Sequence, residues 1–142
     1  MVAKQGLWER LTAIVLNNSN NCVRVFGDFN YVRSSDKRKG KGMVFRLQDA
    51  DLFNKFIADS MLIDLPICGR LFIWYRGDGI TMSWLDWFLL SSKWCEMWPT
   101  CIQVGYQRGL SDHVPVVLHV NDANWGPRPL RMMKRCREYA GV

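Results

Sequence analysis

The apolar residues of this chain come in short runs interrupted by turn-forming residues, which limits the folds open to it. The longest runs, residues 71–75 and 87–90, are far shorter than the ~20 apolar residues of a membrane-spanning helix. Glu9 and Arg10 interrupt the N-terminal segment, so no signal peptide is expected. Hydrophobic residues make up 49% and charged residues 23%, which excludes a disordered or collagen-like chain. We therefore expect a soluble, intracellular protein with no membrane partner.

Helical and strand patterns are mixed along the sequence. Apolar residues recur at helical spacing over residues 6–16 and 48–61, which predicts two helices. Residues 91–98 are expected to form one or two further helical turns. Strands are expected at residues 22–26, 62–65, 71–75, 83–90, 101–106 and 114–120. This mixture predicts an α/β (α+β) sandwich of sheet and helices, with a domain over residues 1–124 and a basic, proline-containing tail over 125–142.

The chain carries 19 Lys and Arg against 13 Asp and Glu, a net charge of +6 that favours polyanionic partners. Several of the basic residues lie in one polar, glycine-containing segment: Arg33, Lys37, Arg38, Lys39 and Lys41. A charged run of this kind is most often only solvated, and contact with a phosphate backbone is the more specific alternative. The five cysteines form no C-x-x-C pair, so reduced thiols are expected in place of a zinc site or a disulfide framework.

Two polar pairs lie beside expected strands. Asp28 and Asn30 follow the first strand, and an acid and an amide at this spacing could orient a water molecule or a phosphate oxygen. On these residues alone, an ordinary Asx turn is the better explanation. Asp112 and His113 precede the last strand, where a histidine beside an acid could act as a base, or donate to a phosphate once protonated. A structural loop histidine is the alternative.

Asp86 lies in the middle of an otherwise apolar strand pattern, residues 84–90. A buried, unpaired carboxylate costs several kcal/mol, so Asp86 must face a cleft or have a partner. The chain has two histidines, and His119 lies in a strand pattern. We therefore predict a hydrogen bond between Asp86 and His113, in which the acid orients the imidazole.

Five sequence motifs occur in the order found in one known family: GDFN (27–30), LIDLP (62–66), GRLFIW (69–74), LDWFLLS (85–91) and RGLSDHVP (108–115). On these motifs the chain resembles the C-terminal part of an endonuclease/exonuclease/phosphatase domain. More narrowly, it is similar to the endonuclease of plant LINE-type (non-LTR) retrotransposons, where the ending WGPRP (125–129) is also familiar. The resemblance covers about residues 23–131.

The resemblance implies a four-layer fold of two mixed sheets with helices outside, and Mg²⁺-dependent hydrolysis of DNA phosphodiesters in the nucleus. Carried over by motif, Asp28 positions or activates the attacking water, and Asn30 holds the phosphate or its metal. Asp86 orients His113, which contacts the scissile phosphate. Asp112 lies near the metal or the leaving group. These five residues are expected to converge at one end of the sheets.

The departures from the family are equally specific. The N-terminal half with its metal-binding glutamate has no counterpart before residue 23, and Trp84 and Trp87 stand where relatives usually carry arginine. Aromatic stacking on nucleic acid is a possible substitute for those cations. We therefore expect a fragment of little or no activity, with an exposed strand edge and an apolar face that bears tryptophans.

Three partners follow from the resemblance: DNA, the missing N-terminal half, and a reverse transcriptase domain in a longer parent protein. Two alternative functions stay open. One is a phosphatase of the same superfamily, which these motifs do not separate from a nuclease. The other is a non-catalytic, basic module that binds nucleic acid through residues 33–41 and the tail.

Overall fold

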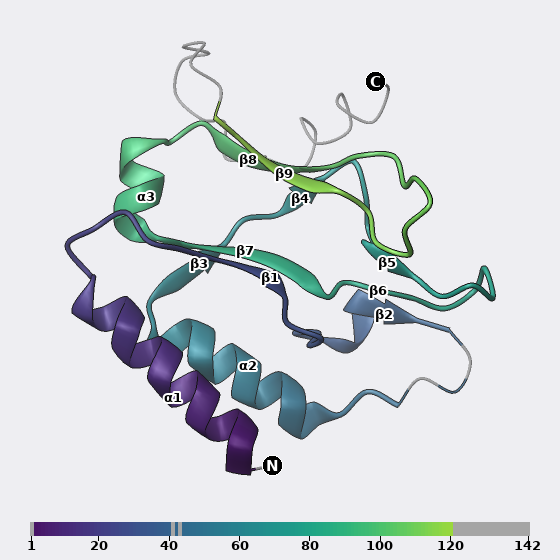
Figure 1. The fold of residues 1–142 in the computed structure, drawn as a ribbon, viewed down its shortest axis with the longest axis horizontal. Coiled ribbons are helices and arrows are strands. Elements are labelled where there is room, and N and C mark those ends of the chain that lie inside the picture. Colours follow the sequence, from purple (N-terminus) through teal and green to yellow (C-terminus); the bar gives the residue numbers. More distant parts are fainter. Residues whose placement is uncertain (1, 41, 43, 121–142) are drawn as a thin grey trace.

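The structure, a computed structural model, describes residues 2–40, 42 and 44–120. Figure 1 shows three layers: two long helices, a sheet packed on them, and a second sheet beyond the first. A smaller third sheet lies at one end of these layers (Figure 1). The described part of the chain is therefore a mixed α+β structure, as the helix and strand patterns predict.

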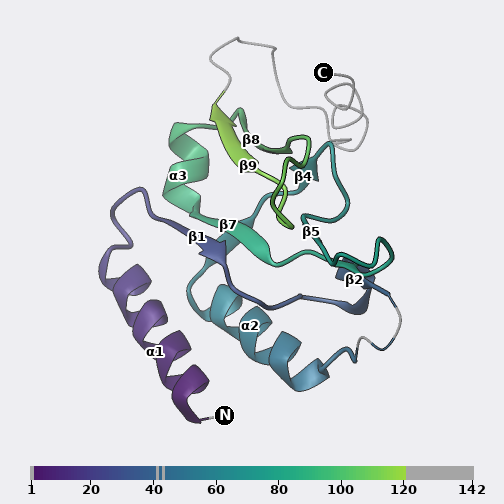
Figure 2. The same cartoon turned by 45° about the vertical axis from the view of Figure 1, so that its right-hand side comes forward.

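The first layer consists of α1 (Val2–Asn17) and α2 (Leu47–Asp59). The two helices lie side by side in both ribbon views (Figure 2). Asp49 lies in the first turn of α2, where a carboxylate interacts favourably with the helix dipole. Both predicted long helices are confirmed, with α1 beginning earlier and α2 ending two residues sooner than predicted.

The first sheet has the strand order β1-β7-β3, with β7 in the centre. Its strands are β1 (Arg24–Asp28), β7 (Asp86–Ser91) and β3 (Leu62–Asp64). Both outer strands run antiparallel to β7. The register between β1 and β7 places Phe26 opposite Phe88 and Asp28 opposite Asp86. Two carboxylates therefore meet at the same end of neighbouring strands.

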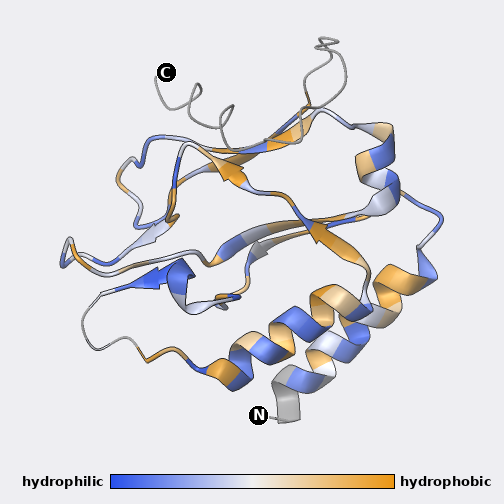
Figure 3. Cartoon of the chain, turned by 180° about the vertical axis from the view of Figure 1, so that it is seen from behind, coloured by the Kyte–Doolittle hydropathy of each residue, from blue (hydrophilic) through white to orange (hydrophobic). Residues whose placement is uncertain are grey.

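An aromatic core joins this sheet to the helices. Phe53 of α2 is fully buried, and its ring centroid lies 5.4 Å from that of Trp8, 6.3 Å from that of Phe56 and 5.6 Å from that of Trp87. Figure 3 shows hydrophobic residues along the strands of the two larger sheets and hydrophilic residues along the short strand β2 (Arg38–Lys39). Burial of these rings holds β7, and with it Asp86, against the helices.

The second sheet has the order β4-β8-β9, with β4 parallel and β9 antiparallel to β8. Its strands are β4 (Ile67–Cys68), β8 (Cys101–Gly105) and β9 (Val116–Val120). The short helix α3 (Ser92–Met97) leads from β7 to β8, and the Ser91 hydroxyl caps it by accepting the Trp94 N–H. Gln103 is buried between the sheets and donates from Nε2 to the carbonyls of Leu65, at 2.7 Å, and Phe88, at 3.3 Å.

The third sheet joins three short strands, in the order β2-β6-β5. Besides β2, these are β6 (Met82–Ser83) and β5 (Trp74–Tyr75), and a 3-10 turn, η1 (Ser35–Lys37), precedes β2. An isolated antiparallel bridge links Trp74 of β5 to His113. This sheet therefore supports the loop that carries the predicted site histidine.

The structure corrects several predicted strands. The strand predicted over residues 83–90 is two strands, β6 and β7, because residues 82–83 pair with β2 and β5 whereas residues 86–91 pair with β1 and β3. Gly27 does not end β1: it adopts a φ of 143°, which favours glycine, and the strand continues to Asp28. The two residues of β4 are too few to show a strand pattern and were not predicted. The remaining predicted strands are confirmed, those at 71–75 and 114–120 in shortened form, as β5 and β9.

The cysteines agree only in part with the prediction of reduced thiols. Cys22 carries a thiol, whereas Cys68 is disulfide-bonded, so the prediction is wrong at that position. Sequence spacing does not show which sulfur atoms approach each other in space, and that proximity decides whether a disulfide forms.

One edge of the first sheet is exposed, as predicted. In the described part of the chain β1 pairs only with β7, and Phe26 on this edge strand is 57% exposed. The tryptophans do not lie on such a face. Trp8, Trp84 and Trp87 are buried, and the other described tryptophans are half-buried. The prediction of a tryptophan-bearing apolar face is therefore wrong for the described residues.

The predicted tail, residues 125–142, lies outside the described residues, as does Lys41. Among the helices that the structure describes, none combines the length and the apolar character needed to cross a membrane.

We expect the substitution Phe53→Ala to lower the free energy of unfolding by about 3–5 kcal/mol, because it leaves a cavity among five aromatic rings. The matched control is Leu71→Ala at a side chain that is 79% exposed, with an expected change below about 0.5 kcal/mol. Urea unfolding measures both values. Equal losses in the two variants would show that this aromatic core does not stabilise the fold.

Candidate functional site

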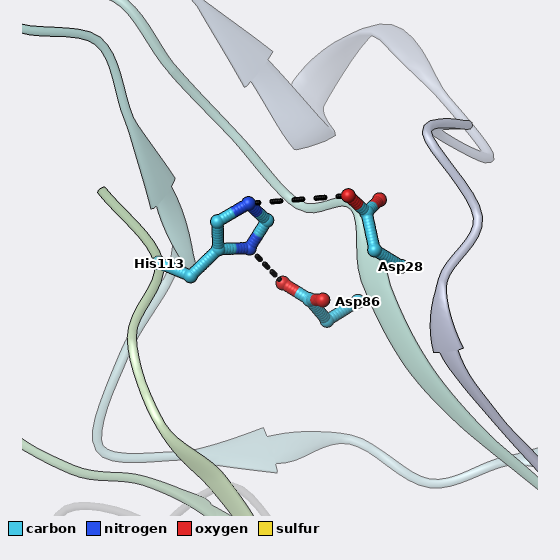
Figure 4. A group of neighbouring side chains, drawn as sticks. All are labelled: Asp28, Asp86 and His113. Carbon is cyan, nitrogen blue, oxygen red and sulfur yellow. Dashed lines mark hydrogen bonds and ion pairs between the residues drawn. The ribbon is translucent and has the colours of Figure 1, made fainter. Parts of the chain in front are cut away.

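A histidine hydrogen-bonded to an aspartate is the centre of the site. His113 Nδ1 lies 2.7 Å from Asp86 Oδ2, which confirms the predicted pairing of the two side chains (Figure 4). Asp86 is the first residue of β7, and His113 lies in the loop before β9. Backbone hydrogen bonds on both sides of His113 tie this loop to β5 and the residue before it: Tyr75 N–H donates to Asp112 O at 2.9 Å, and Val114 N–H donates to Ile73 O at 2.7 Å.

Asp28 lies on the other side of the imidazole. Its Oδ2 is 3.9 Å from His113 Nε2, so the ring stands between two carboxylates that come from neighbouring strands (Figure 4). Asp28 Oδ1 accepts the backbone N–H of Asn30 at 2.8 Å. This is the Asx turn weighed for the sequence, and it fixes the carboxylate so that its second oxygen faces the ring.

The surrounding charges perturb both members of the pair. Burial favours the neutral imidazole, but the hydrogen bond to Asp86 and the charges of Asp86, Asp28 and Asp112 outweigh it, so the pKa of His113 is raised. Burial raises the pKa of the Asp86 carboxyl, and the hydrogen bond and charge of His113 lower it only in part. The site therefore favours a protonated imidazole beside Asp86.

Asn30 and Asp112 are near the site but not part of this group. Asn30 is exposed, has a φ of 56°, and lines an open pocket of about 390 Å³ together with Arg38 and Arg46. Asp112 Oδ2 accepts a hydrogen bond from Trp74 Nε1 at 3.0 Å. The structure thus brings together three of the five predicted side chains, with Asn30 and Asp112 beside them.

The three central residues are also the group that could hold a metal ion in the described part of the chain. One ligand atom each from Asp28, Asp86 and His113 lie within 4.8 Å of one another, and Asp112, predicted near a metal, is not in this group. Mg²⁺ demands near-octahedral oxygen coordination at 2.0–2.1 Å. Here one ligand is a nitrogen, and an oxygen of each carboxylate already accepts a hydrogen bond. These residues by themselves do not fit a resident Mg²⁺.

Most of the predicted basic segment contacts protein groups. Arg33 forms an ion pair with Asp64 at 2.7 Å and donates to Asn54 Oδ1 at 2.8 Å. The Lys37 ammonium lies 4.1 Å from the centroid of the Trp84 ring. Arg38 makes long hydrogen bonds to Ser83 and Val44. Only Lys39, among the described basic residues of this segment, is exposed without such a contact. This segment is therefore mainly structural.

The two tryptophans beside Asp86 are also structural. Trp84 is 5% and Trp87 1% exposed, so neither ring is open to stacking on nucleic acid, and the predicted substitute for the arginines is wrong. The indole N–H of Trp84 donates to the Asp86 carbonyl at 2.9 Å, and that of Trp87 donates to the Tyr31 carbonyl at 2.9 Å. Trp84 therefore positions the backbone of Asp86, as Trp74 positions Asp112. Two sequence features could have indicated these positioning residues: Trp84 lies two residues before Asp86, and Trp74 is the last residue of the GRLFIW motif.

Comparison of the chain with protein-family models gives no match, and neither does comparison with curated proteins.

The protonation of His113 predicts a pH dependence of stability. Because the pKa of His113 is raised in the folded chain, its contribution is present below about pH 6.5 and is lost as the pH rises through the folded pKa. We expect the loss to stay below about 1 kcal/mol, since ion pairs partly open to solvent are weak. Urea unfolding across this range measures it.

Two variants test the cause of this pH dependence. Asp86→Asn removes the hydrogen-bonded charge, and NMR titration of the ring Cε1 proton is expected to show a lower pKa of His113. His119→Gln alters the other histidine and is expected to leave the pH dependence unchanged. A native His113 pKa at or below the ordinary value would contradict the electrostatic account.

Substitutions of Arg33 and Lys39 test whether the basic segment has a structural role, because Arg33 forms an ion pair within the protein and Lys39 is exposed. Burial raises the pKa of Asp64 and Arg33 opposes this shift, so Arg33→Met leaves a largely buried carboxylate without its cation. We expect a loss of about 1–3 kcal/mol in the free energy of unfolding. Lys39→Met is expected to change it by less than about 0.5 kcal/mol. Weaker DNA binding with unchanged stability in Arg33→Met would instead assign Arg33 to a nucleic-acid surface.

Proposed function

We propose that this chain is a retrotransposon-derived, endonuclease-like domain whose site acts on the phosphodiesters of DNA. The observation that carries the proposal is the imidazole of His113 held between Asp86 and Asp28, 2.7 and 3.9 Å away. The five motifs in family order support the class of substrate and a four-layer parent fold, of which the three layers of the described residues would be a part. A nuclear location follows from the same resemblance.

Each side chain has a definite task in this proposal. Asp86 accepts a hydrogen bond from the Nδ1–H of His113 and so directs Nε2 outward, toward Asp28 and the substrate. Because the pKa of His113 is raised, the imidazole carries a proton at Nε2. This N–H donates a hydrogen bond to a phosphate oxygen as negative charge develops there. Asp28 Oδ2 orients the attacking water and accepts its proton as the water oxygen bonds to phosphorus. The P–O bond to the leaving alcohol breaks in the same displacement, and solvent water protonates the leaving oxygen. Asn30 fixes Asp28 through its backbone N–H.

The same geometry predicts low activity. Enzymes that hydrolyse phosphodiesters commonly use divalent cations to neutralise the phosphate. The residues here do not form a magnesium site by themselves, so the proposed reaction relies on His113 for positive charge. The basic binding remnant is less favoured, because Arg33, Lys37 and Arg38 are engaged within the protein. A phosphatase would use the same three side chains and differs only in its substrate.

We expect no nicking of supercoiled plasmid at an enzymatic rate, with or without magnesium. The activated diester bis(p-nitrophenyl) phosphate has a good leaving group, so its hydrolysis needs less catalysis than that of DNA. We expect the parent chain to hydrolyse it slowly. The rate is expected to fall about tenfold or more in His113→Ala and in Asp28→Ala. His119→Ala, at the histidine that contacts Tyr106 on the second sheet, is the matched control and is expected to retain the parent rate.

Three outcomes would each contradict a part of this proposal. Equal hydrolysis by the parent chain and His113→Ala would remove the catalytic role of the histidine. Plasmid nicking by the parent chain that both substitutions abolish would show a complete enzyme and overturn the expectation of low activity. Faster hydrolysis of p-nitrophenyl phosphate, a monoester, than of the diester would favour the phosphatase.

A further inference from the structure

Among the described residues, no strand pairs with the outer edge of β1, where backbone groups follow one another in a defined order. Ser91 N–H donates to Val23 O at 2.9 Å, and Phe29 N–H donates to Leu85 O at 3.0 Å. In an antiparallel ladder the residues alternate, so the odd-numbered residues of this strand bond to β7. The N–H and C=O groups of Arg24, Phe26 and Asp28 therefore point away from the sheet.

The side chains of the same three residues lie on one face of the strand and are all exposed. Phe26, at 57% exposure, stacks on Phe88 with ring centroids 5.3 Å apart. Arg24 and Asp28 lie two residues before and two residues after it. The exposed side chains of β1 are therefore positive, apolar and negative in order along the strand. When a second copy of the strand runs in the opposite direction, each charge faces one of the opposite sign.

We propose that two copies of the chain associate through β1, antiparallel about a two-fold axis at Phe26, so that Arg24 of each copy lies opposite Asp28 of the other. In this register, the residues whose backbone groups point away from the sheet pair only with the same residues of the other copy. The two β1 strands overlap over their whole length. It joins the two three-stranded sheets into one continuous sheet. The two contacts are equivalent, as a closed two-fold interface requires.

The outer edge of β9, in the second sheet, does not offer this complementarity. On β9 the outward groups belong to Val116, Leu118 and Val120, because Tyr106 N–H donates to the Pro115 carbonyl and fixes the alternation. None of these residues is charged. Of these two described edges, β1 alone carries opposite charges at matching distances from a central apolar residue.

The association has a consequence for the site, and this part of the inference rests on the proposed function. Asp28 Oδ2 is 3.9 Å from His113 Nε2, so the partner's Arg24 brings a guanidinium next to the reacting groups. A guanidinium binds phosphate oxygens in a bidentate geometry. Each copy thereby supplies its neighbour with the cation that the three residues of a single chain lack.

Charge reversal tests the register. Arg24→Asp and Asp28→Arg each place like charges opposite one another at both equivalent contacts, and each is expected to raise the dimer dissociation constant about tenfold or more in sedimentation equilibrium. The double variant, Arg24→Asp with Asp28→Arg, restores opposite charges and is expected to return the dissociation constant to near the parent value. Val117→Asp, on β9, is the control and is expected to leave association unchanged.

The parent chain gives a second test that needs no substitution. Hydrogen exchange at the amides of Arg24, Phe26 and Asp28 is expected to slow as the protein concentration rises, whereas exchange at Leu118 stays constant. A parent chain that is monomeric at millimolar concentration, single reversals without effect, a double variant that fails to recover, or growth into open aggregates would each overturn the proposal. None of these measurements depends on catalysis, so failure of the dimer and failure of the proposed activity are separate results.

Discussion

The antiparallel register between β1 and β7 is the constraint on which the site depends. It sets Asp28 opposite Asp86 at the same end of neighbouring strands, where both carboxylates can face the imidazole of His113. A slip of one residue would turn every side chain of β1 to the other face of the sheet. Phe26 would then enter the aromatic core, and Asp28 would leave the imidazole. The packing of Phe53 against Trp87 therefore protects the geometry of the site although neither residue reaches it.

Sequence reasoning succeeded where local energetics were decisive. An aspartate inside an apolar strand must find a partner, and only one histidine lay in a suitable loop, so the pair Asp86–His113 followed from two residues. The two long helices followed from periodicity in the same way. The relation of Asp28 to the ring was a weaker prediction, because it depends on how two strands distant in sequence align.

The incorrect predictions came from tertiary contacts that the sequence pattern does not show. The sequence places Arg33 and Lys37 in a segment expected to be solvated or to bind phosphate. In the folded chain Arg33 forms an ion pair with Asp64, and the Lys37 ammonium lies over the Trp84 ring. Trp84 and Trp87 read as surface substitutes for arginine, yet their indole N–H groups have backbone acceptors inside the protein. In each case one distant acceptor or ring decided the role of the residue.

Gln103, a buried residue of β8, forms hydrogen bonds to the first sheet as well as belonging to the second. Its amide nitrogen donates to the carbonyl of Leu65, which follows β3, and to that of Phe88 in β7, and so it links the two layers through buried polar contacts. Apolar surfaces can slide over one another with little change in energy, whereas a buried donor keeps its acceptors only at one relative position of the layers. Asp86 belongs to one of these layers, and the strand that follows His113 belongs to the other. The Gln103 amide thus helps to set the spacing of Asp86 and His113, because it holds the two sheets in one relative position.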